Sequence, residues 1–314
     1  MSAEIVTLTD AAAGTSAEIL VSQGFNCFRF SANVRGRPVE VIYAPPDFAE
    51  GTGRPSRGGI PLLFPFPGRI PGTRFRWEGH DYPLEPGDAL GNAIHGFALS
   101  RPWRLIESEA ARVAGQFHAR RDDPSLTSRW PADFQITATY QLAGNLLAGH
   151  FLFENPSDTP LPCGFGAHPY FRVPIGGPGG DDCVVKLPVS ARWELRDMLP
   201  TGRMLALPNE AAFAAGQRFG QMQFDDVFTG LAFGGGWCSA SIFDPGSGCT
   251  VTQRFDGAFR ECVVYTPPHR QAICIEPYTC VPGAFALEER GIDAGLRIVP
   301  PGGSFAARVE INVT

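Results

Sequence analysis

Four segments of the sequence place ionisable or aromatic side chains directly beside glycine and proline. They are residues 58–69 (GGIPLLFPFPGR), 92–97 (NAIHGF), 164–171 (GFGAHPYF) and 274–279 (CIEPYT). Glycine and proline mark loops and strand ends, where functional side chains are often held. Histidine and glutamate, both found in these segments, are the side chains that most often transfer protons in enzymes. We therefore expect the four segments to direct their side chains into a shared cleft.

The elements that must position these segments are predicted to be β-strands. Residues 134–140 and 305–313 alternate strictly between apolar and polar side chains, which is the pattern of a half-buried strand. Further strands are predicted at 18–21, 25–30, 39–43, 113–119, 150–153, 184–187, 237–243, 249–255 and 261–265. Only 209–215 and 284–290 resemble short helices. The sequence therefore predicts an all-β protein, with a β-sandwich as the arrangement that covers so many strand faces.

Length and composition limit the possible classes of protein. The chain has 314 residues, of which 44% are hydrophobic and 18% charged, which is too apolar for a disordered protein. We find no internal repeat and no shift in composition, and expect a single domain over residues 1–314. The net charge of −6, with Lys186 the only lysine, indicates no nucleic-acid partner. No apolar run is long enough to span a membrane, and we expect a cytoplasmic protein.

Eight cysteines raise the possibility of a disulfide framework or a zinc site. None of them forms a C-x-x-C pair, and the sequence contains no H-x-H or H-x-x-E-H motif. Several lie in apolar strand-like runs, where cysteine behaves as a small buried hydrophobic residue. The glycine-rich stretches at 175–180 and 234–236 match neither of two phosphate-binding motifs, G-x-x-x-x-G-K-[S/T] and G-x-G-x-x-G between a strand and a helix. They are expected to be loops. We expect reduced core thiols and no metal.

Five motifs occur in an order that resembles one known family. They are GGIPLLFPFPGRI, HGFALSRPW, GFGAHPYFRVP, FDDVFTG and CIEPYTCVPGAF. Together they resemble the aldose 1-epimerase (galactose mutarotase) family over about residues 58–285. The resemblance implies a large antiparallel β-sandwich of the supersandwich type, a sugar substrate, and neither a metal nor an organic cofactor.

The resemblance also assigns catalytic roles. Interconversion of sugar anomers requires a base that removes the proton from the anomeric hydroxyl O1 and an acid that protonates the ring oxygen O5. Glu276 matches the base of the family, and its apolar neighbours are expected to move its pKa toward neutrality. His168 matches the acid, and an ordinary histidine pKa near ~6.5 suits reversible proton transfer.

Three further positions match residues that bind the sugar in the family. Arg69 and His95 are expected to donate hydrogen bonds around the ring oxygen and its neighbouring hydroxyls. The pattern then requires an aspartate, and the sequence offers Asp225 and Asp226, which a strand would direct to opposite faces. We select Asp225 by the family pattern and keep Asp226 as the alternative.

Two other functions remain open. The segment around His168 departs from the Thr-Asn-His form of the best-known members, which leaves the sugar undefined, and some relatives act on hexose 6-phosphates. Arg74, Arg76 and Arg172 could then bind a phosphate. A non-catalytic sugar-binding protein is the third hypothesis. The candidates for stacking on the sugar are Phe66, Phe97, Tyr170 and Tyr278, and the sequence leaves open whether the protein is a monomer or a homodimer.

Overall fold

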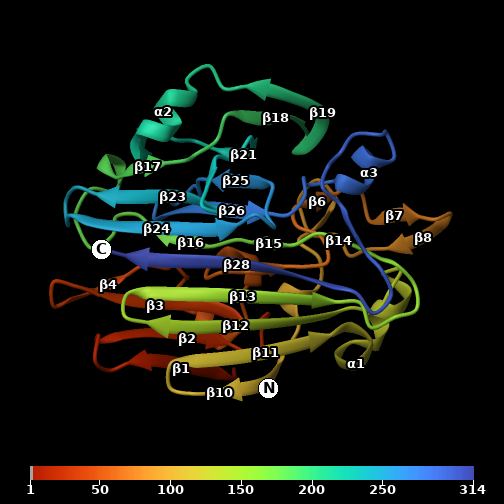
Figure 1. Cartoon of the computed structure of the whole chain (residues 1–314), viewed down its shortest axis with the longest axis horizontal. Coiled ribbons are helices and arrows are strands. Elements are labelled where there is room, and N and C mark those ends of the chain that lie inside the picture. Colours follow the sequence, from red (N-terminus) through yellow and green to blue (C-terminus); the bar gives the residue numbers. More distant parts are fainter. Residues whose placement is uncertain (1–2) are drawn as a thin grey trace.

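The computed structural model describes residues 3–314, and β-strands dominate it (Figure 1). Every ladder between two strands of the described residues is antiparallel. The predicted all-β class and antiparallel sandwich are therefore confirmed. Two large sheets, called here the support sheet and the site sheet, carry most of the strands.

The support sheet forms one layer of the sandwich and has ten strands within the described residues. In spatial order it contains β10 (Arg104–Ser108), β11 (Arg112–His118), β12 (Gln135–Ala143), β13 (Leu146–Glu154), β28 (Ser304–Val313), β24 (Cys249–Asp256), β23 (Trp237–Asp244), β17 (Val184–Lys186) and β20 (Gln217–Arg218), and β22 (Phe233–Gly234) pairs with β23. The last strand of the chain, β28, lies between β13 and β24 near the middle of this sheet (Figure 1).

The site sheet carries the segments that the sequence analysis singled out. Its spatial order is β19 (Leu199–Ala206), β18 (Ala191–Arg196), β21 (Asp225–Thr229), β25 (Glu261–Tyr265), β26 (Ala272–Tyr278), β15 (Gly166–Ala167) and β5 (Leu62–Leu63), and β16 (Tyr170–Arg172) pairs with β26. Residues more than one hundred positions apart in the sequence thus become neighbours across hydrogen-bonded strands.

Smaller elements complete the described structure. A four-stranded sheet contains β1 (Ile5–Asp10), β2 (Thr15–Leu20), β3 (Asn26–Val34) and β4 (Arg37–Glu40), and the two-stranded pairs are β14 (Leu161–Cys163) with β27 (Arg297–Val299), β6 (Arg69–Ile70) with β9 (Ala93–Ile94), and β7 (Arg74–Trp77) with β8 (His80–Pro83). The α-helices are α1 (Ala119–Asp122), α2 (Glu210–Ala215) and α3 (Ala284–Glu288). Short 3₁₀ turns occur at Phe48–Glu50, Pro55–Arg57, Ala98–Ser100, Pro124–Ser128, Gly180–Asp182 and Phe219–Gln221.

The strands and helices predicted from the sequence correspond closely to those of the structure. The two predicted helices appear as α2 and α3, and the sequence analysis missed α1, which is a single turn without a detectable period. The alternation predicted for 305–313 is confirmed in β28, where Ala307 and Val309 are buried while Arg308 between them is exposed. By contrast, β26 is buried at every residue because both faces of this central strand are covered.

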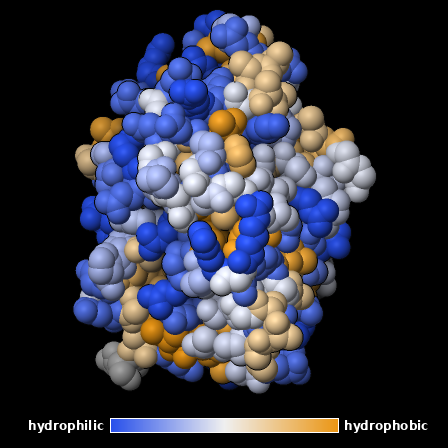
Figure 2. All heavy atoms as spheres, turned by 90° about the vertical axis from the view of Figure 1, so that its left-hand side faces the viewer, coloured by the Kyte–Doolittle hydropathy of each residue, from blue (hydrophilic) through white to orange (hydrophobic). Residues whose placement is uncertain are grey.

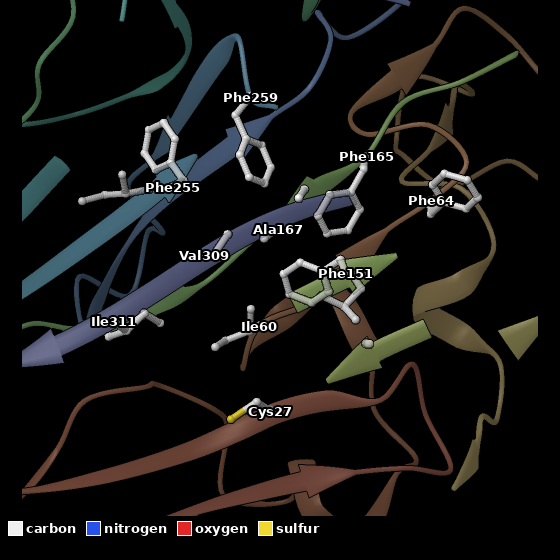
Figure 3. Packing of buried hydrophobic residues seen from close by; sticks show 14 of the residues in the cluster. Cys27, Ile60, Phe64, Phe151, Phe165, Ala167, Phe255, Phe259, Val309 and Ile311 are labelled. Carbon is white, nitrogen blue, oxygen red and sulfur yellow. The ribbon is translucent and has the colours of Figure 1, made fainter. Parts of the chain in front are cut away.

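The core between the two sheets is rich in phenylalanine (Figure 3). Phe165, which is fully buried, packs its ring against Phe151, Phe153 and Phe259 at centroid distances of 5.0, 4.6 and 6.0 Å. Such tilted contacts between rings add to the free energy gained by burying their surface. This packing fixes the inner face of the site sheet, so that its outer face is free to carry polar groups.

All eight cysteines lie within the described residues, where they are buried and free. The part of the surface seen in Figure 2 is covered mainly by hydrophilic side chains, with apolar groups scattered between them. Within residues 3–314, no helix has the length and apolar character needed to cross a membrane.

We predict that Phe165→Ala lowers the free energy of unfolding by about 3–5 kcal/mol, because it leaves a cavity among the rings of Phe151, Phe153 and Phe259. Urea denaturation followed by tryptophan fluorescence measures the change. The control is Phe243→Ala in β23. Because Phe243 is 40% exposed, this substitution should lower the free energy of unfolding much less. Equal losses in the two variants would contradict this account of the core.

Candidate functional site

A cavity of about 180 Å³ opens on the outer face of the site sheet. The residues that line it include all five predicted site residues, namely Arg69, His95, His168, Asp225 and Glu276. The structure thus brings into one cavity five side chains that come from widely separated parts of the sequence. The hydrophobic contribution to the wall comes from Leu195, Met198, Val227, Val263 and Pro282.

Strand register explains why the two carboxylates share this cavity. Glu276 of β26 lies opposite Val263 of β25, while Tyr265 of β25 lies opposite Asp225 of β21. Since side chains two residues apart point to the same face of a sheet, Glu276 and Asp225 both point outward. Asp226 points to the other face and forms an ion pair with Arg192 at 2.8 Å. Of the two alternatives, Asp225 is therefore the one that reaches the cavity.

The same register brings His168 beside Glu276. Gly166 of β15 pairs with Tyr278, and Tyr170 of β16 pairs with Cys274, so the chain between them runs along β26. His168 lies midway between these pairs and therefore stands opposite Glu276. Its backbone N–H donates to the carbonyl of Pro61 at 3.0 Å, which ties this short interruption of the strand to the chain just before β5.

Arg69 and His95 come from the small β6–β9 pair at the cavity mouth. Arg69 pairs with Ile94, so the next residue, His95, turns back toward Gly68. The backbone N–H of His95 donates to the Gly68 carbonyl at 2.8 Å, and the Gly68 N–H donates to His95 Nδ1 at 3.3 Å. Because Nδ1 accepts, the proton of the neutral ring is on Nε2, where it can be donated.

The backbone at His95 is left-handed, with a φ of 69°. Non-glycine residues rarely adopt this conformation, which costs free energy and is concentrated at functional sites. Gly96, which follows, has a φ of 70°, and a Cβ there would lie 2.3 Å from the Phe64 carbonyl oxygen. Gly96 therefore permits the turn that directs His95 into the cavity.

Glu276 and His168 form the closest ionisable pair of the site. His168 Nε2 lies 3.2 Å from Glu276 Oε1, and the hydroxyl of Tyr278 donates to Glu276 Oε2 at 2.7 Å. Tyr170 stacks on the His168 ring with a centroid distance of 4.8 Å and an interplanar angle of 4°. The His168 ring also makes an edge-to-face contact with the His95 ring, with a centroid distance of 5.6 Å. Both members of the pair are thus held by neighbouring side chains.

Burial determines the protonation state of this pair. It raises the pKa of Glu276 well above its usual value, although the hydrogen bond from Tyr278 acts in the opposite direction. It lowers the pKa of His168 to about 3. Burial therefore favours the uncharged form of each group, in which the carboxyl group holds its proton and the imidazole does not. The two groups are 3.2 Å apart, close enough for the proton to pass between them.

The other polar groups of the cavity have separate electrostatic roles. Burial, together with the nearby His168 and Arg69, lowers the pKa of His95 well below its usual value, so His95 is a neutral donor. Arg69 pairs through Nε with Asp88 at 2.9 Å, which fixes its guanidinium group at the cavity wall. Burial raises the pKa of Asp225, and Arg69 partly offsets this effect.

Several residues considered from the sequence lie elsewhere. Phe66 and Phe97 pack against Trp130, at centroid distances of 5.6 and 6.0 Å, and do not line this cavity. Arg172 donates to the Ile42 carbonyl. Arg74 and Arg76 belong to β7 and border a different cavity.

Sequence reasoning missed the partner of Glu276. Tyr278 follows Glu276 by two positions, so the period of a strand already places both side chains on one face. From the sequence, Tyr278 is expected to shield Glu276 from water or to stack on the sugar, and its hydrogen bond to the carboxyl group is not predicted. Tyr265, Leu195 and Met198 in the cavity wall were also missed, and no motif of the sequence marks them.

One group of the described residues has the composition of a metal site. Potential ligand atoms of His168, Cys274 and Glu276 all lie within 4.8 Å of one another. Burial raises the pKa of the Cys274 thiol well above its usual value, so this sulfur is protonated and a poor ligand. We therefore assign no metal to the site.

Comparison with known proteins agrees with this architecture. The family model described as aldose 1-epimerase matches residues 6–312, and the chain belongs to this family. The chain is 23% identical to the uncharacterized protein YihR of Escherichia coli over 74% of its own length and 72% of YihR. It is 24% identical to the uncharacterized protein YphB of Escherichia coli over 35% of its own length, and this match spans only 36% of YphB.

A solved structure shows the same fold over the whole length of the chain. It is a galactose mutarotase-like protein from Clostridium acetobutylicum with a TM-score of 0.86 and 21% sequence identity, and the alignment covers 100% of this chain and 99% of that protein. At this level of identity the likeness establishes the fold and leaves the activity to be argued from the site.

We predict that the His168 ring of the ligand-free protein stays neutral as the pH falls through 6.5, its ordinary pKa, because burial lowers the folded-state pKa to about 3. The unfolded chain takes up this proton near pH 6.5, so His168 contributes a fall in the free energy of unfolding as the pH decreases from 6.5 toward 3. Nitrogen-15 NMR of the histidine rings, assigned with His168→Gln, measures the titration. A His168 resonance that titrates near pH 6.5 would refute the prediction.

Proposed function

We propose that this protein is an aldose 1-epimerase that interconverts the α and β anomers of a hexose. The observation that carries the proposal is the contact of 3.2 Å between Glu276 and His168 at the cavity. The polar side chains of Arg69, His95 and Asp225 line the same cavity. The anomeric oxygen O1 and the ring oxygen O5 are both bonded to C1. An acid and a base that serve these two oxygens must therefore be close neighbours, as Glu276 and His168 are.

The reaction needs only proton transfers and one bond cleavage. Ionised Glu276 removes the proton of the O1 hydroxyl while protonated His168 gives a proton to O5. The C1–O5 bond breaks, its electron pair stays on O5, and C1–O1 becomes a carbonyl group. After rotation about C1–C2, protonated Glu276 returns its proton to O1, His168 takes back the proton of O5, and the ring closes on the opposite face.

The position of one proton on the pair decides which half-reaction it can begin. Ring opening requires ionised Glu276 with protonated His168, whereas ring closure requires protonated Glu276 with neutral His168. Both states carry a single proton and differ by its transfer between Glu276 Oε1 and His168 Nε2. Burial favours this one-proton condition, since it opposes both a second proton on His168 and the loss of the proton from Glu276.

The surrounding groups are suited to hold the sugar. His95 Nε2–H and the guanidinium of Arg69 donate hydrogen bonds where negative charge develops as the ring opens. The Asp225 carboxylate accepts hydrogen bonds from sugar hydroxyls. Held rigidly, these contacts keep O1 and O5 next to the proton-transfer pair, which is how positioning lowers an activation barrier.

The charges of the cavity favour a neutral sugar over a hexose 6-phosphate. Arg69 is the only arginine or lysine lining the described cavity, and Asp88 already neutralises it. Asp225 adds a carboxylate, and the arginines considered for phosphate binding lie outside the cavity. A phosphate dianion would lack the clustered cations that usually bind it.

We predict that Glu276→Gln lowers kcat at least about 100-fold, because glutamine cannot accept the O1 proton. His168→Gln should have a comparable effect through loss of the acid at O5. Saturation-transfer NMR between the anomer signals of the preferred sugar measures both rates after subtraction of the uncatalysed exchange. Wild-type activity in the Glu276→Gln protein would remove Glu276 from the mechanism.

The neighbouring aspartates offer a matched pair of variants. Asp225→Asn should raise KM about tenfold or more, because a carboxylate that accepts sugar hydroxyls is lost. Asp226→Asn removes the same charge on the other face of β21 and should leave KM nearly unchanged. If Asp226→Asn has the larger effect on KM, the assignment of Asp225 is wrong.

The proposal itself is tested with glucose, galactose and glucose 6-phosphate as substrates. Acceleration of anomer exchange for a neutral hexose, insensitive to inorganic phosphate, supports it. Strong competition by inorganic phosphate would favour a hexose-6-phosphate epimerase. Saturable binding of a sugar without faster exchange would indicate a sugar-binding protein instead.

A further inference from the structure

We propose that Tyr278 is a positioning residue, whose phenolic O–H holds the Glu276 carboxyl group in the orientation that presents Oε1 to the substrate. The inference rests on the proposed function in one respect, namely that Glu276 is the base. The role follows from the hydrogen bond and the packing around this one side chain.

The two oxygens of Glu276 have different partners. Oε2 accepts the hydrogen bond of Tyr278 at 2.7 Å, whereas Oε1 faces His168 Nε2 at 3.2 Å. Both Glu276 and Tyr278 are 1% exposed, so water does not compete for this bond. Because the Tyr278 hydroxyl occupies Oε2, the carboxyl group cannot rotate without breaking a buried hydrogen bond. Oε1 is thereby left as the oxygen that can take the substrate proton.

The Tyr278 ring is itself held in place by a close backbone contact. Tyr278 of β26 lies opposite Gly166 of β15, and the two strands are hydrogen-bonded neighbours. A Cβ at Gly166 would lie 2.6 Å from Cδ1 and 2.7 Å from Cε1 of the ring, distances that real Cβ atoms do not show. The ring is therefore seated directly on the Gly166 backbone. Glycine at 166 is what lets the Tyr278 hydroxyl reach Glu276.

Donation from Tyr278 also favours the ionised form of the base. The other titratable or charged groups around Glu276 are Arg69, His168, Tyr170, Asp225, Cys262, Tyr265 and Cys274. Among them Asp225 acts on Glu276 as a like charge and Arg69 as an opposite one. A hydrogen bond to a carboxylate stabilises its charge and opposes the effect of burial. Without Tyr278, the proton shared with His168 would be held more tightly by Glu276.

The main test is Tyr278→Phe, which removes the hydroxyl and keeps the ring. Carbon-13 NMR of labelled glutamate carboxyl groups, with Glu276→Gln for assignment, should show the Glu276 pKa raised by about one unit or more. The rate of ring opening should fall about ten- to hundredfold, with a smaller change in KM. The alkaline limb of the pH–rate profile, where the pair loses its last proton, should move to higher pH.

The matched control is Tyr265→Phe, which makes the same chemical change in the wall of the same cavity. Among the described residues, Tyr265 forms no hydrogen bond with Glu276, so the Glu276 titration should shift much less. An unchanged Glu276 titration and an unchanged alkaline limb in Tyr278→Phe would overturn the proposal and leave Tyr278 a packing residue. Equal shifts in both variants would also overturn it.

A second variant covers the case in which Tyr278→Phe does not fold. Gly166→Ala keeps the Tyr278 hydroxyl, but its Cβ displaces the Tyr278 ring from its contact with residue 166. It should therefore raise the Glu276 pKa, as Tyr278→Phe does. If Gly166→Ala shifts the ring without affecting the Glu276 titration, the proposal fails. The carboxyl titration needs no substrate, so a shift in these variants supports the role of Tyr278 even if the wild-type protein epimerises no sugar.

Discussion

The site depends on the placement of two buried ionisable groups in contact at the wall of a cavity that is partly polar and partly apolar. Burial makes charge costly for both Glu276 and His168, so it raises the pKa of the carboxyl group and lowers that of the imidazole. The two groups lie 3.2 Å apart, which allows one proton to pass between them. The arrangement requires that water be excluded, that the orientation of both side chains be fixed, and that nearby charges be few. Much of the surrounding structure meets these three requirements.

Exclusion of water follows from the position of β26 within the sandwich. Its inner face packs against the support sheet through residues such as Ile273 and Ile275, which belong to the large core. On its outer face Tyr278 packs with Trp193, Val227 and Val263 in a smaller apolar cluster. A strand buried on both sides can carry a carboxyl group that is nearly inaccessible and still lies beside the cavity.

The sequence predicted the fold class and the members of the site, but not their geometry. Alternation in 305–313 identified a strand because its two faces have different surroundings. In β26 both faces are buried, so alternation is absent, and the chemical role of Glu276 had to come from family resemblance. The choice between Asp225 and Asp226 depended on the register of β21 against β25, which is a long-range property. The hydrogen bond from Tyr278 to Glu276 was accessible in principle from their spacing. The contact between the Tyr278 ring and Gly166 could not be predicted in this way, because β15 and β26 are distant in the sequence.

The division of the site between strands and turns also has a physical reason. Proton transfer depends on distances of a few tenths of an ångström, so its two partners are best placed on hydrogen-bonded strands with fixed register. Glu276 is on such a strand, and His168 bridges two short strands that pair with it. Contacts with a sugar tolerate more variation, and the donors that we propose for them come from the small β6–β9 pair and the strained turn at His95. Asp225, the proposed acceptor, lies on β21 in the same sheet as Glu276. Changes in the turns would therefore alter the donors offered to the sugar while leaving the proposed proton-transfer pair and Asp225 in place.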